Sequence, residues 1–405
     1  MNYSETLEFL FQQLPIYQRI GKAAYKADLD NTIALSIFFK EPHEHFRSVH
    51  IAGTNGKGSV AHMLASVMQE AGYSTGLYTS PHLKIFRERI KINGEMIPES
   101  DVVTFVEQAR PVIEKIQPSF FELTMMMAFS HFRKNDVDIA IIETGMGGRL
   151  DSTNIITPEV SVITNIGYDH TAFLGSDLPS IAEEKAGIIK ENIPIVIGRA
   201  EGEIKKLFEE KARSLAAPLI FAQFEPEQDL QCALKGSKQK ENITTCLATL
   251  GRLKAKYKKI SDRSISRGLQ NVIKNTGIQG RWQQMQKKPM VIADIAHNQD
   301  SIEALLENSA RTTFKDLHVV LGMVNDKDLN VLLQMLPTKA RYYFCKAKIP
   351  RGMEANILAS KAKEHGLQGD TYSSVKKAFS AAKGSANVED LVLITGSAFV
   401  VAEVL

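Results

Sequence analysis

The sequence is poor in cysteine and has no long apolar run. Its three cysteines, Cys232, Cys246 and Cys345, are widely spaced and form no CxxC pair, so the sequence indicates neither a disulfide framework nor a cysteine-bound zinc site. The N-terminus has no basic segment followed by an apolar core, and no apolar run is long enough to span a membrane. We therefore expect a cytoplasmic protein that is not bound to a membrane.

An excess of one charge is also missing. The net charge is only +3 at pH 7, which gives no support to a nucleic-acid-binding surface, and the basic cluster from Lys254 to Lys259 is more typical of a solvated helix face than of an anion-binding patch. Hydrophobic residues make up 44% of the chain and charged residues 23%, as in soluble globular proteins. Because a chain of 405 residues is longer than one ordinary hydrophobic core accommodates, we expect two domains.

The stretch from Ser48 to Ser59, SVHIAGTNGKGS, has the pattern of a buried strand, a glycine-rich loop and the start of a helix. Glycines allow backbone N–H groups to approach an anion, the helix N-terminus adds a positive dipole, Lys57 can bridge terminal phosphates, and Ser59 can hold Mg²⁺. The pattern predicts a nucleoside triphosphate site, although a simple glycine turn would share it. Gly58 separates the lysine from the serine, whereas the ordinary P-loop has Ser or Thr directly after the lysine.

Strands and helices alternate along the rest of the chain. Apolar runs predict strands at Ser74 to Thr79, Asp138 to Thr144, Val160 to Ile166, Ile193 to Gly198, Met290 to Ile295, Leu317 to Met323, Tyr342 to Cys345 and Leu391 to Thr395. This alternation predicts an α/β fold with largely parallel sheets. We expect a P-loop mononucleotide-binding domain over residues 1–285 and a smaller, Rossmann-like α/β domain over residues 286–405, with a hinge at the Lys-Lys-Pro of Lys287 to Pro289.

Polar residues at the predicted strand ends are candidates for metal binding. Glu143 ends an apolar strand and precedes Gly145, Gly147 and Gly148, which is where a metal-holding carboxylate belongs in a phosphate-binding α/β sheet. Ser80 follows another predicted strand and is either a Mg²⁺ ligand or a turn residue. The sequence therefore predicts a metal site beside the phosphate loop.

A series of short motifs is more specific than these patterns. In chain order they are HIAGTNGKGSV (His50 to Val60), YTSPHL (Tyr78 to Leu83), RERI (Arg87 to Ile90), FFELT (Phe120 to Thr124), ETGMGGRLDSTNII (Glu143 to Ile156), NIGYDHTAFLG (Asn165 to Gly175), EEKAGIIK (Glu183 to Lys190), GRW (Gly280 to Trp282), DIAHN (Asp294 to Asn298) and GMVNDKD (Gly322 to Asp328). This order resembles the folylpolyglutamate synthase and dihydrofolate synthase family of the Mur ligase superfamily. The resemblance covers nearly the whole chain from residue 48 and includes the extra glycine at Gly58.

The resemblance implies an ATP-dependent ligase that joins L-glutamate to the carboxylate of dihydropteroate or of a reduced folate through an acyl phosphate. A carboxylate is a poor acyl donor, and phosphoryl transfer activates it mainly through positioning and charge neutralisation. Such chemistry needs a phosphate cradle and metal ligands, and no Gly-x-Ser-x-Gly nucleophile elbow occurs in the sequence. The family also implies two Mg²⁺ sites and a monomer.

The resemblance implies four groups of site residues. The residues implied for ATP are Asn55, Gly56, Lys57, Gly58, Ser59, Asn242, Arg281 and Asp294. Those implied for Mg²⁺ are Ser59, Ser80 and Glu143 at one site and His170 with a carbamylated Lys185 at the other. Those implied for the acceptor are Ser119, Phe121, Glu122, Leu150, Asp151 and Ser152. Those implied in catalysis are Lys57, His170, Lys185 and His297. Without the resemblance, Lys185 reads as an exposed helix lysine, and for His297 a structural role is as plausible as a catalytic one.

Departures from the family pattern are few. Lys238 stands where the family commonly has the histidine of a His-Gln pair, and Gln283 replaces an acid that often follows the Gly-Arg motif, which affects the expected adenine pocket. One alternative is another Mur-type ligase, such as a muramyl peptide ligase. The other is a P-loop switch that binds a partner, which predicts a guanine-reading Asn-Lys-x-Asp; the sequence lacks one, although Asn325 to Asp328 is superficially similar.

Overall fold

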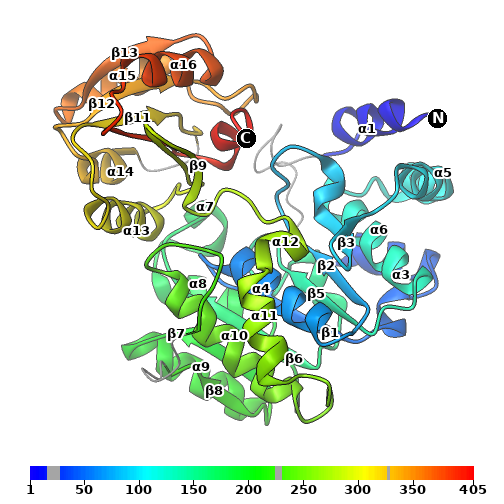
Figure 1. Ribbon diagram of the computed structural model, residues 1–405. Helices are drawn as coiled ribbons and strands as arrows, with labels where there is room; N and C mark the ends of the chain where they lie inside the picture. Colours follow the sequence, from blue (N-terminus) through cyan, green and yellow to red (C-terminus); the bar gives the residue numbers. More distant parts are fainter. Residues whose placement is uncertain (16–27, 224–229, 326–328) are drawn as a thin grey trace. The chain divides into compact units, whose positions relative to one another are not determined.

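The computed structural model describes residues 1–15, 28–223, 230–325 and 329–405, and its chain divides into two compact units (Figure 1). The first unit comprises Met1–Ala233 and Gln239–Gly277, and the second comprises Leu234–Lys238 and Ile278–Leu405. Parts of three sequence predictions lie outside the described residues: the helical N-terminal segment, the polar helical stretch after Glu201, and the motif that ends at Asp328.

The first unit is built around one mixed sheet. Its strands are β1 (Ser48–Ala52), β2 (Thr75–Tyr78), β3 (Ile90–Ile92), β4 (Glu95–Met96), β5 (Ile139–Glu143), β6 (Val160–Asn165), β7 (Ile195–Arg199) and β8 (Leu219–Phe221). They form an eight-stranded sheet in the order β4-β3-β2-β5-β1-β6-β7-β8. Strands β2, β5, β1, β6, β7 and β8 are neighbours in this order and pair in parallel. Strands β3 and β4 add an antiparallel edge next to β2. Strands β1 and β5 are buried at every position, which explains their continuous apolar sequences.

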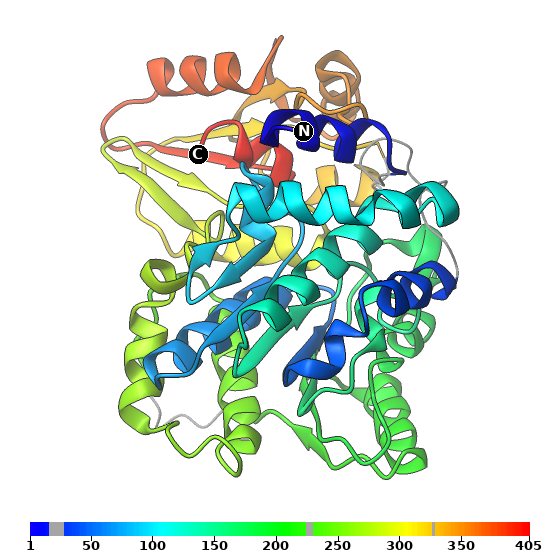
Figure 2. The ribbon, with the colours of Figure 1, turned by 90° about the vertical axis from the view of Figure 1, so that its right-hand side faces the viewer.

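Helices cover the sheet of the first unit. They are α1 (Tyr3–Gln12), α3 (Asp30–Phe38), α4 (Lys57–Glu70), α5 (Glu99–Ile116), α6 (Phe120–Lys134), α7 (Thr171–Leu174), α8 (Leu178–Ala186), α9 (Gly202–Ser214), α10 (Gln239–Leu253), α11 (Asp262–Gln270) and α12 (Val272–Thr276), with the 3₁₀ turns η2 (Pro42–His45), η3 (Phe86–Arg89) and η4 (Ser152–Ile155). Helices α5 and α6 share a core with Ala140 and Ile142 of β5, and Figure 2 shows α5 as the long cyan helix. Helix α4 is buried from Gly58 to Met68 and packs against the sheet and α10, α11 and α12.

The second unit is a smaller α/β layer structure. Its strands are β9 (Gln283–Lys287), β10 (Met290–Ala293), β11 (Leu317–Leu321), β12 (Arg341–Cys345), β13 (Gln368–Tyr372) and β14 (Leu391–Thr395). They form a sheet in the order β13-β12-β11-β14-β10-β9, in which only β9 is antiparallel to its neighbour. Helices α13 (Gln299–Ala310), α14 (Leu329–Met335) and α15 (Ala355–Glu364) share one core, and α16 (Val375–Ser385) and α17 (Ala398–Ala402) share another.

The division of the chain differs from the predicted hinge. Lys287 to Pro289 lie at the turn between β9 and β10, which pair antiparallel with Met290 opposite Lys287, so this turn is inside the second unit. Strand β9 is not predictable from the sequence, because QQMQK has no apolar periodicity. The second unit instead begins at Ile278, after Gly277 ends α12 in the left-handed conformation, and it also includes Leu234–Lys238.

Each predicted strand is present, and the strands that the sequence did not reveal are short or polar. The β3–β4 pair turns at Asn93 and Gly94, both with positive φ, and β8 has three residues. Strand β13 is an exposed edge with the sequence QGDTY, so burial imposes no apolar pattern on it. In the described parts of the chain, no helix is both long and apolar enough to cross a membrane.

Candidate functional site

The glycine loop between β1 and α4 has the conformation that its sequence predicts. Gly56 precedes the helix with φ 84°, and a Cβ atom at this position would collide with the side-chain oxygen of Asn242. The first helical hydrogen bond runs from Val60 N to Gly56 O at 2.9 Å. The amides of Lys57 to Ser59 therefore precede the first helical bond and point out of the helix N-terminus, as an anion-binding site requires.

The carboxyl end of β6 holds this loop in place. Asn165 accepts from Thr54 N through its backbone oxygen at 3.0 Å and from Asn55 N through its side-chain oxygen at 2.9 Å. Thr164 Oγ1 donates to Asn55 O at 2.6 Å, and the Thr54 hydroxyl exchanges hydrogen bonds with Gly167. Sequence reasoning missed Thr54, Thr164 and Asn165 as loop anchors, because nothing in the strand VSVITN shows what its ends contact.

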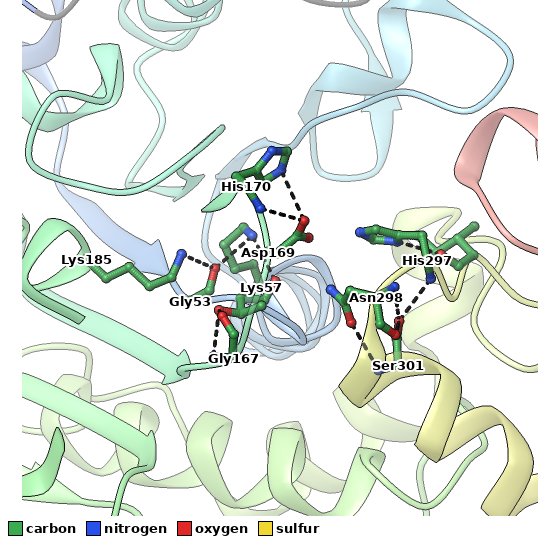
Figure 3. A network of polar contacts seen from close by, with 11 residues as sticks. Gly53, Lys57, Gly167, Asp169, His170, Lys185, His297, Asn298 and Ser301 are labelled. Carbon is green, nitrogen blue, oxygen red and sulfur yellow. Dashed lines mark hydrogen bonds and ion pairs between the residues drawn. The ribbon is translucent and has the colours of Figure 1, made fainter. Parts of the chain in front are cut away.

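Two lysine amines converge on one carbonyl group of the loop. Lys57 Nζ donates to Gly53 O at 2.9 Å and to Thr54 O at 3.3 Å, and Lys185 Nζ donates to the same Gly53 O at 3.0 Å (Figure 3). Lys185 is only 3% exposed, which contradicts the reading of an exposed helix lysine. Burial, followed by the charge of Lys57, lowers its pKa to about 7 from 10.5, while Asp169 acts in the opposite direction. In a large fraction of the molecules, the Lys185 amine is therefore uncharged at neutral pH.

Glu143 lies at the carboxyl end of β5, where the sequence predicts it. Glu143 is 5% exposed, and its carboxylate accepts a hydrogen bond from Ser80 N at 3.2 Å, so the structure brings these two predicted metal ligands together. Ser59 is buried in the first turn of α4. Among the described residues, no three His, Cys, Asp or Glu side chains gather as a metal site would require. The predicted set still fits Mg²⁺ chemically, because carboxylate and hydroxyl oxygens are the hard ligands that this ion prefers.

His170 follows β6 and is held by its neighbour. Its backbone has φ 51°, and its backbone N–H donates to Asp169 Oδ1 at 2.8 Å. The same oxygen lies 4.0 Å from His170 Nε2 (Figure 3). Because Asp169 also acts on the charge of Lys185, it links two predicted site residues, and the sequence analysis did not single it out.

The residues predicted to bind the acceptor surround the start of α6 and the turn after β5. Ser119 caps α6, and its amide donates to Glu122 Oε2 at 2.5 Å while its hydroxyl accepts from Glu122 N at 3.2 Å, so these two side chains form a capping box. The ring of Phe121 is half-buried, with its centroid 6.0 Å from that of Tyr78. Leu150 is half-buried and Ser152 is buried.

Asp151 is directed at the backbone of its own turn. Its carboxylate accepts from Gly145 N at 2.8 Å, from Met146 N at 2.9 Å and from both the backbone N and the hydroxyl of Thr153, at 3.0 and 2.5 Å. Burial raises the pKa of Asp151, and the hydrogen bonds oppose this shift. The predicted acceptor-binding aspartate therefore fixes the conformation of the glycine turn.

The predicted nucleotide residues of the second unit lie around β10. Asp294 accepts from Trp282 N at 2.7 Å and from Ala296 N at 2.9 Å, and burial raises its pKa. The positive charge of Arg281 opposes this rise in the pKa of Asp294, so Arg281 lies near Asp294. His297 Nδ1 lies 2.8 Å from Ile295 O, and the backbone N–H of His297 donates to the hydroxyl of Ser301 in the first turn of α13 (Figure 3). In the first unit, Asn242 donates to Gln239 Oε1 at 3.0 Å.

Comparisons with known proteins agree with this architecture. Residues 51–266 match the Mur ligase middle domain, and residues 280–398 match the glutamate ligase domain of Mur ligases. The chain is 34% identical over 397 residues to the dihydrofolate synthase/folylpolyglutamate synthase of Bacillus subtilis, with 90% of each chain covered. It is also 32% identical to a probable bifunctional folylpolyglutamate synthase/dihydropteroate synthase of Haloferax volcanii, of which it spans only 50% of the length.

Solved structures with this fold carry bound ligands, among them DHPP, ADP and AMPPNP. The structure of E. coli FolC in complex with DHPP and ADP superposes with a TM-score of 0.87 at 29% identity and covers 100% of this chain and 97% of that one. A bifunctional folylpolyglutamate synthase/dihydrofolate synthase from Yersinia pestis, complexed with AMPPNP and Mn ion, has the same TM-score at 28% identity, with 100% and 97% coverage. The chain therefore belongs to the Mur ligases, and within them to the dihydrofolate synthase/folylpolyglutamate synthase family.

Proposed function

We propose that this protein is an ATP-dependent ligase that forms an amide bond between L-glutamate and the carboxylate of dihydropteroate, of a reduced folate, or of both. The observation that carries the proposal is the arrangement of Lys57 and Lys185, whose amines converge on Gly53 O. They lie beside the N-terminus of α4, where no side chain among the described residues caps the helix. The names of the relatives and the ligands of the similar structures support the same activity.

The proposed reaction has two steps. The acceptor carboxylate attacks the γ-phosphorus of ATP to give an acyl phosphate and ADP, and the glutamate amine then attacks the acyl carbon and releases inorganic phosphate. The amides of Lys57 to Ser59 and the ammonium group of Lys57 bind the phosphate oxygens, and this positioning and neutralisation lower the barrier. Because both bound substrates are anionic, the positive charge of Lys57 beside Gly53 favours the attack.

Divalent metal would complete the charge balance. In the proposal, Ser59, Ser80 and Glu143 hold one Mg²⁺, and His170 and a carbamylated Lys185 hold the other. When bound, the metal neutralises phosphate charge. Carbamylation requires the uncharged amine, which gains a carboxylate from CO₂ and loses one proton, and a Lys185 pKa of about 7 provides that amine at neutral pH.

The remaining site residues have proposed roles in recognition. The acceptor lies against Ser119, Phe121, Glu122, Leu150, Asp151 and Ser152. The nucleotide contacts Asn55, Gly56, Gly58, Asn242, Arg281 and Asp294. Aromatic contact with Phe121 suits a flat pteridine or benzoyl ring, and His297 takes part in the chemistry. We also propose that the protein is a cytoplasmic monomer that does not bind nucleic acid.

A coupled ADP-release assay tests this function. Purified protein receives ATP, Mg²⁺ and L-glutamate with dihydropteroate, with tetrahydrofolate, or with a UDP-muramyl acceptor, and a reaction without acceptor is the control. Glutamate-dependent ADP release with either folate-type acceptor is the expected result. Release with the muramyl acceptor alone would instead identify a muramyl peptide ligase, and the absence of release with every acceptor would refute the proposal.

A further inference from the structure

A buried chain of hydrogen bonds joins strand β1 to the glycine turn after β5. His50 Nε2 lies 2.8 Å from Thr153 Oγ1, which in turn donates to Asp151 Oδ1 at 2.5 Å. The other carboxylate oxygen of Asp151 accepts from Gly145 N and Met146 N. His50 and Thr153 have no exposed surface, and Asp151 is 5% exposed. The chain thus connects the strand that leads into the phosphate loop with the turn that carries the proposed acceptor site.

The positions of the hydrogens in this chain follow from the donors and acceptors. Four donors face the Asp151 carboxylate, so it acts only as an acceptor. The Thr153 hydroxyl donates its one hydrogen to Asp151, so it must accept a hydrogen bond from His50. Nε2 of His50 therefore carries the ring hydrogen. Within the described part of the chain, His50 Nδ1 has no hydrogen-bond partner, and burial lowers the pKa of His50 to about 3. The ring is therefore neutral, and each member of the chain has one defined role.

The turn held by this chain also supports an aromatic ring. A Cβ atom at Gly145 would lie 2.6 Å from two ring atoms of Phe121 and 3.3 Å from Asp151 Oδ2. The Phe121 ring therefore lies directly against the Gly145 backbone, whose amide Asp151 holds. Displacement of the Gly145 backbone would displace the Phe121 ring, because there is no free space between them.

We infer that Thr153 is a positioning residue for acceptor binding, which acts through the carboxylate of Asp151 on the Gly145 backbone and thereby on the Phe121 ring. The inference rests on the proposed function, in which Phe121 contacts the aromatic part of the acceptor. Thr153 itself has no exposed surface and does not contact substrate. Its hydroxyl instead preorganises one wall of the site, as the supporting contacts of a binding site do.

Two substitutions at one position separate the hydroxyl from the shape of the side chain. Thr153→Val keeps the branched shape and removes the hydroxyl, and Thr153→Ser keeps the hydroxyl. In Thr153→Val, Asp151 loses a charge-assisted hydrogen bond and His50 keeps a buried N–H without an acceptor, so we expect the KM for the folate-type acceptor to rise about tenfold. The KM for ATP should change by less than about twofold, and Thr153→Ser should behave like the wild-type enzyme.

Hydrogen exchange of the intact protein provides a readout that does not depend on catalysis. We expect the amides of residues 145–153 to exchange faster in Thr153→Val than in the wild type and in Thr153→Ser, whereas amides of the other strands of the first unit keep their exchange rates. Equal acceptor KM values for the valine and serine variants, a parallel rise of both substrate KM values, or faster exchange throughout the first unit would each overturn the inference.

A second pair of variants covers the case in which Thr153→Val does not fold. His50→Gln retains an N–H group near the position of Nε2, and His50→Leu removes it; the same selective effects in His50→Leu alone would support the chain, and their absence would overturn it. The two proposals fail in different ways. Wild-type protein without ADP release refutes the ligase function, and the exchange experiment still decides whether the Thr153 hydroxyl holds the turn.

Discussion

Replacement of Lys185 by methionine should stabilise the protein while it abolishes turnover. The folded pKa of Lys185 is about 7, against an ordinary value of 10.5, and the side chain is almost completely buried. Each pKa unit corresponds to about 1.4 kcal/mol, so the buried charge costs about 5 kcal/mol of unfolding free energy below pH 7. Methionine retains the apolar stem and removes this cost.

The effect of this substitution has a defined dependence on pH. Between pH 7 and 10.5 the unfolded wild-type chain binds more protons than the folded chain, so wild-type stability rises with pH in this window. The advantage of Lys185→Met should therefore be largest below pH 7 and should disappear as the pH approaches 10.5. Turnover should be lost at every pH, because methionine cannot form the proposed carbamate.

Urea unfolding in CO₂-free buffer, followed by circular dichroism, measures this advantage at about pH 6 and about pH 9. Lys211→Met is a matched control, because Lys211 is an exposed lysine of α9 and its replacement should give no pH-dependent difference. A Lys185→Met variant that is destabilised, or stabilised equally at both pH values, would refute the burial argument. Such a trade between stability and activity is expected where function requires a destabilising group.

Three further substitutions test the phosphate loop and the metal site. Lys57→Ala should reduce ADP release at least about a hundredfold while the melting temperature changes little, because the γ-phosphate loses its side-chain cation; a wild-type rate would contradict the assignment. Glu143→Gln should raise the Mg²⁺ concentration for half-maximal rate about tenfold or more, because the carboxylate ligand is lost, and an unchanged Mg²⁺ titration would exclude Glu143 as a ligand. Gly56→Ala should weaken ADP binding, measured by calorimetry, because its Cβ meets Asn242. Gly72→Ala has the same strained φ in open space and should cost only about 1 kcal/mol of stability; equal ADP affinity in both variants would contradict the steric argument.

The parts of the site that could be predicted from the sequence are encoded locally. The segment from β1 through the glycine loop into α4 is continuous in the chain, and its glycines, lysine and helical periodicity are readable without tertiary information. Glu143 is predictable for a similar reason, because the carboxyl end of a buried parallel strand is defined by the end of an apolar run. The nine predicted strands are all present in the sheets.

The parts that could not be predicted depend on contacts between distant segments. IAEEKAGIIK contains two acids before Lys185, and nothing in it indicates that the amine lies against Gly53, far away in the sequence. The capping box that joins Ser119 to Glu122 is visible as Ser-x-x-Glu, although a binding role was assigned to both side chains. The start of the second unit at Ile278 could not be predicted from the sequence, because the polar strand β9 is recognisable only from its pairing with β10.

The transfer of isotopic oxygen from the acceptor to phosphate tests the central claim most directly. Dihydropteroate or tetrahydrofolate labelled with ¹⁸O in its reacting carboxylate is converted with ATP and glutamate, and the inorganic phosphate is analysed by mass spectrometry. The account predicts that one carboxylate oxygen appears in each phosphate released, because the acyl phosphate breaks between that oxygen and the acyl carbon. ADP release and amide formation with unlabelled phosphate would contradict it.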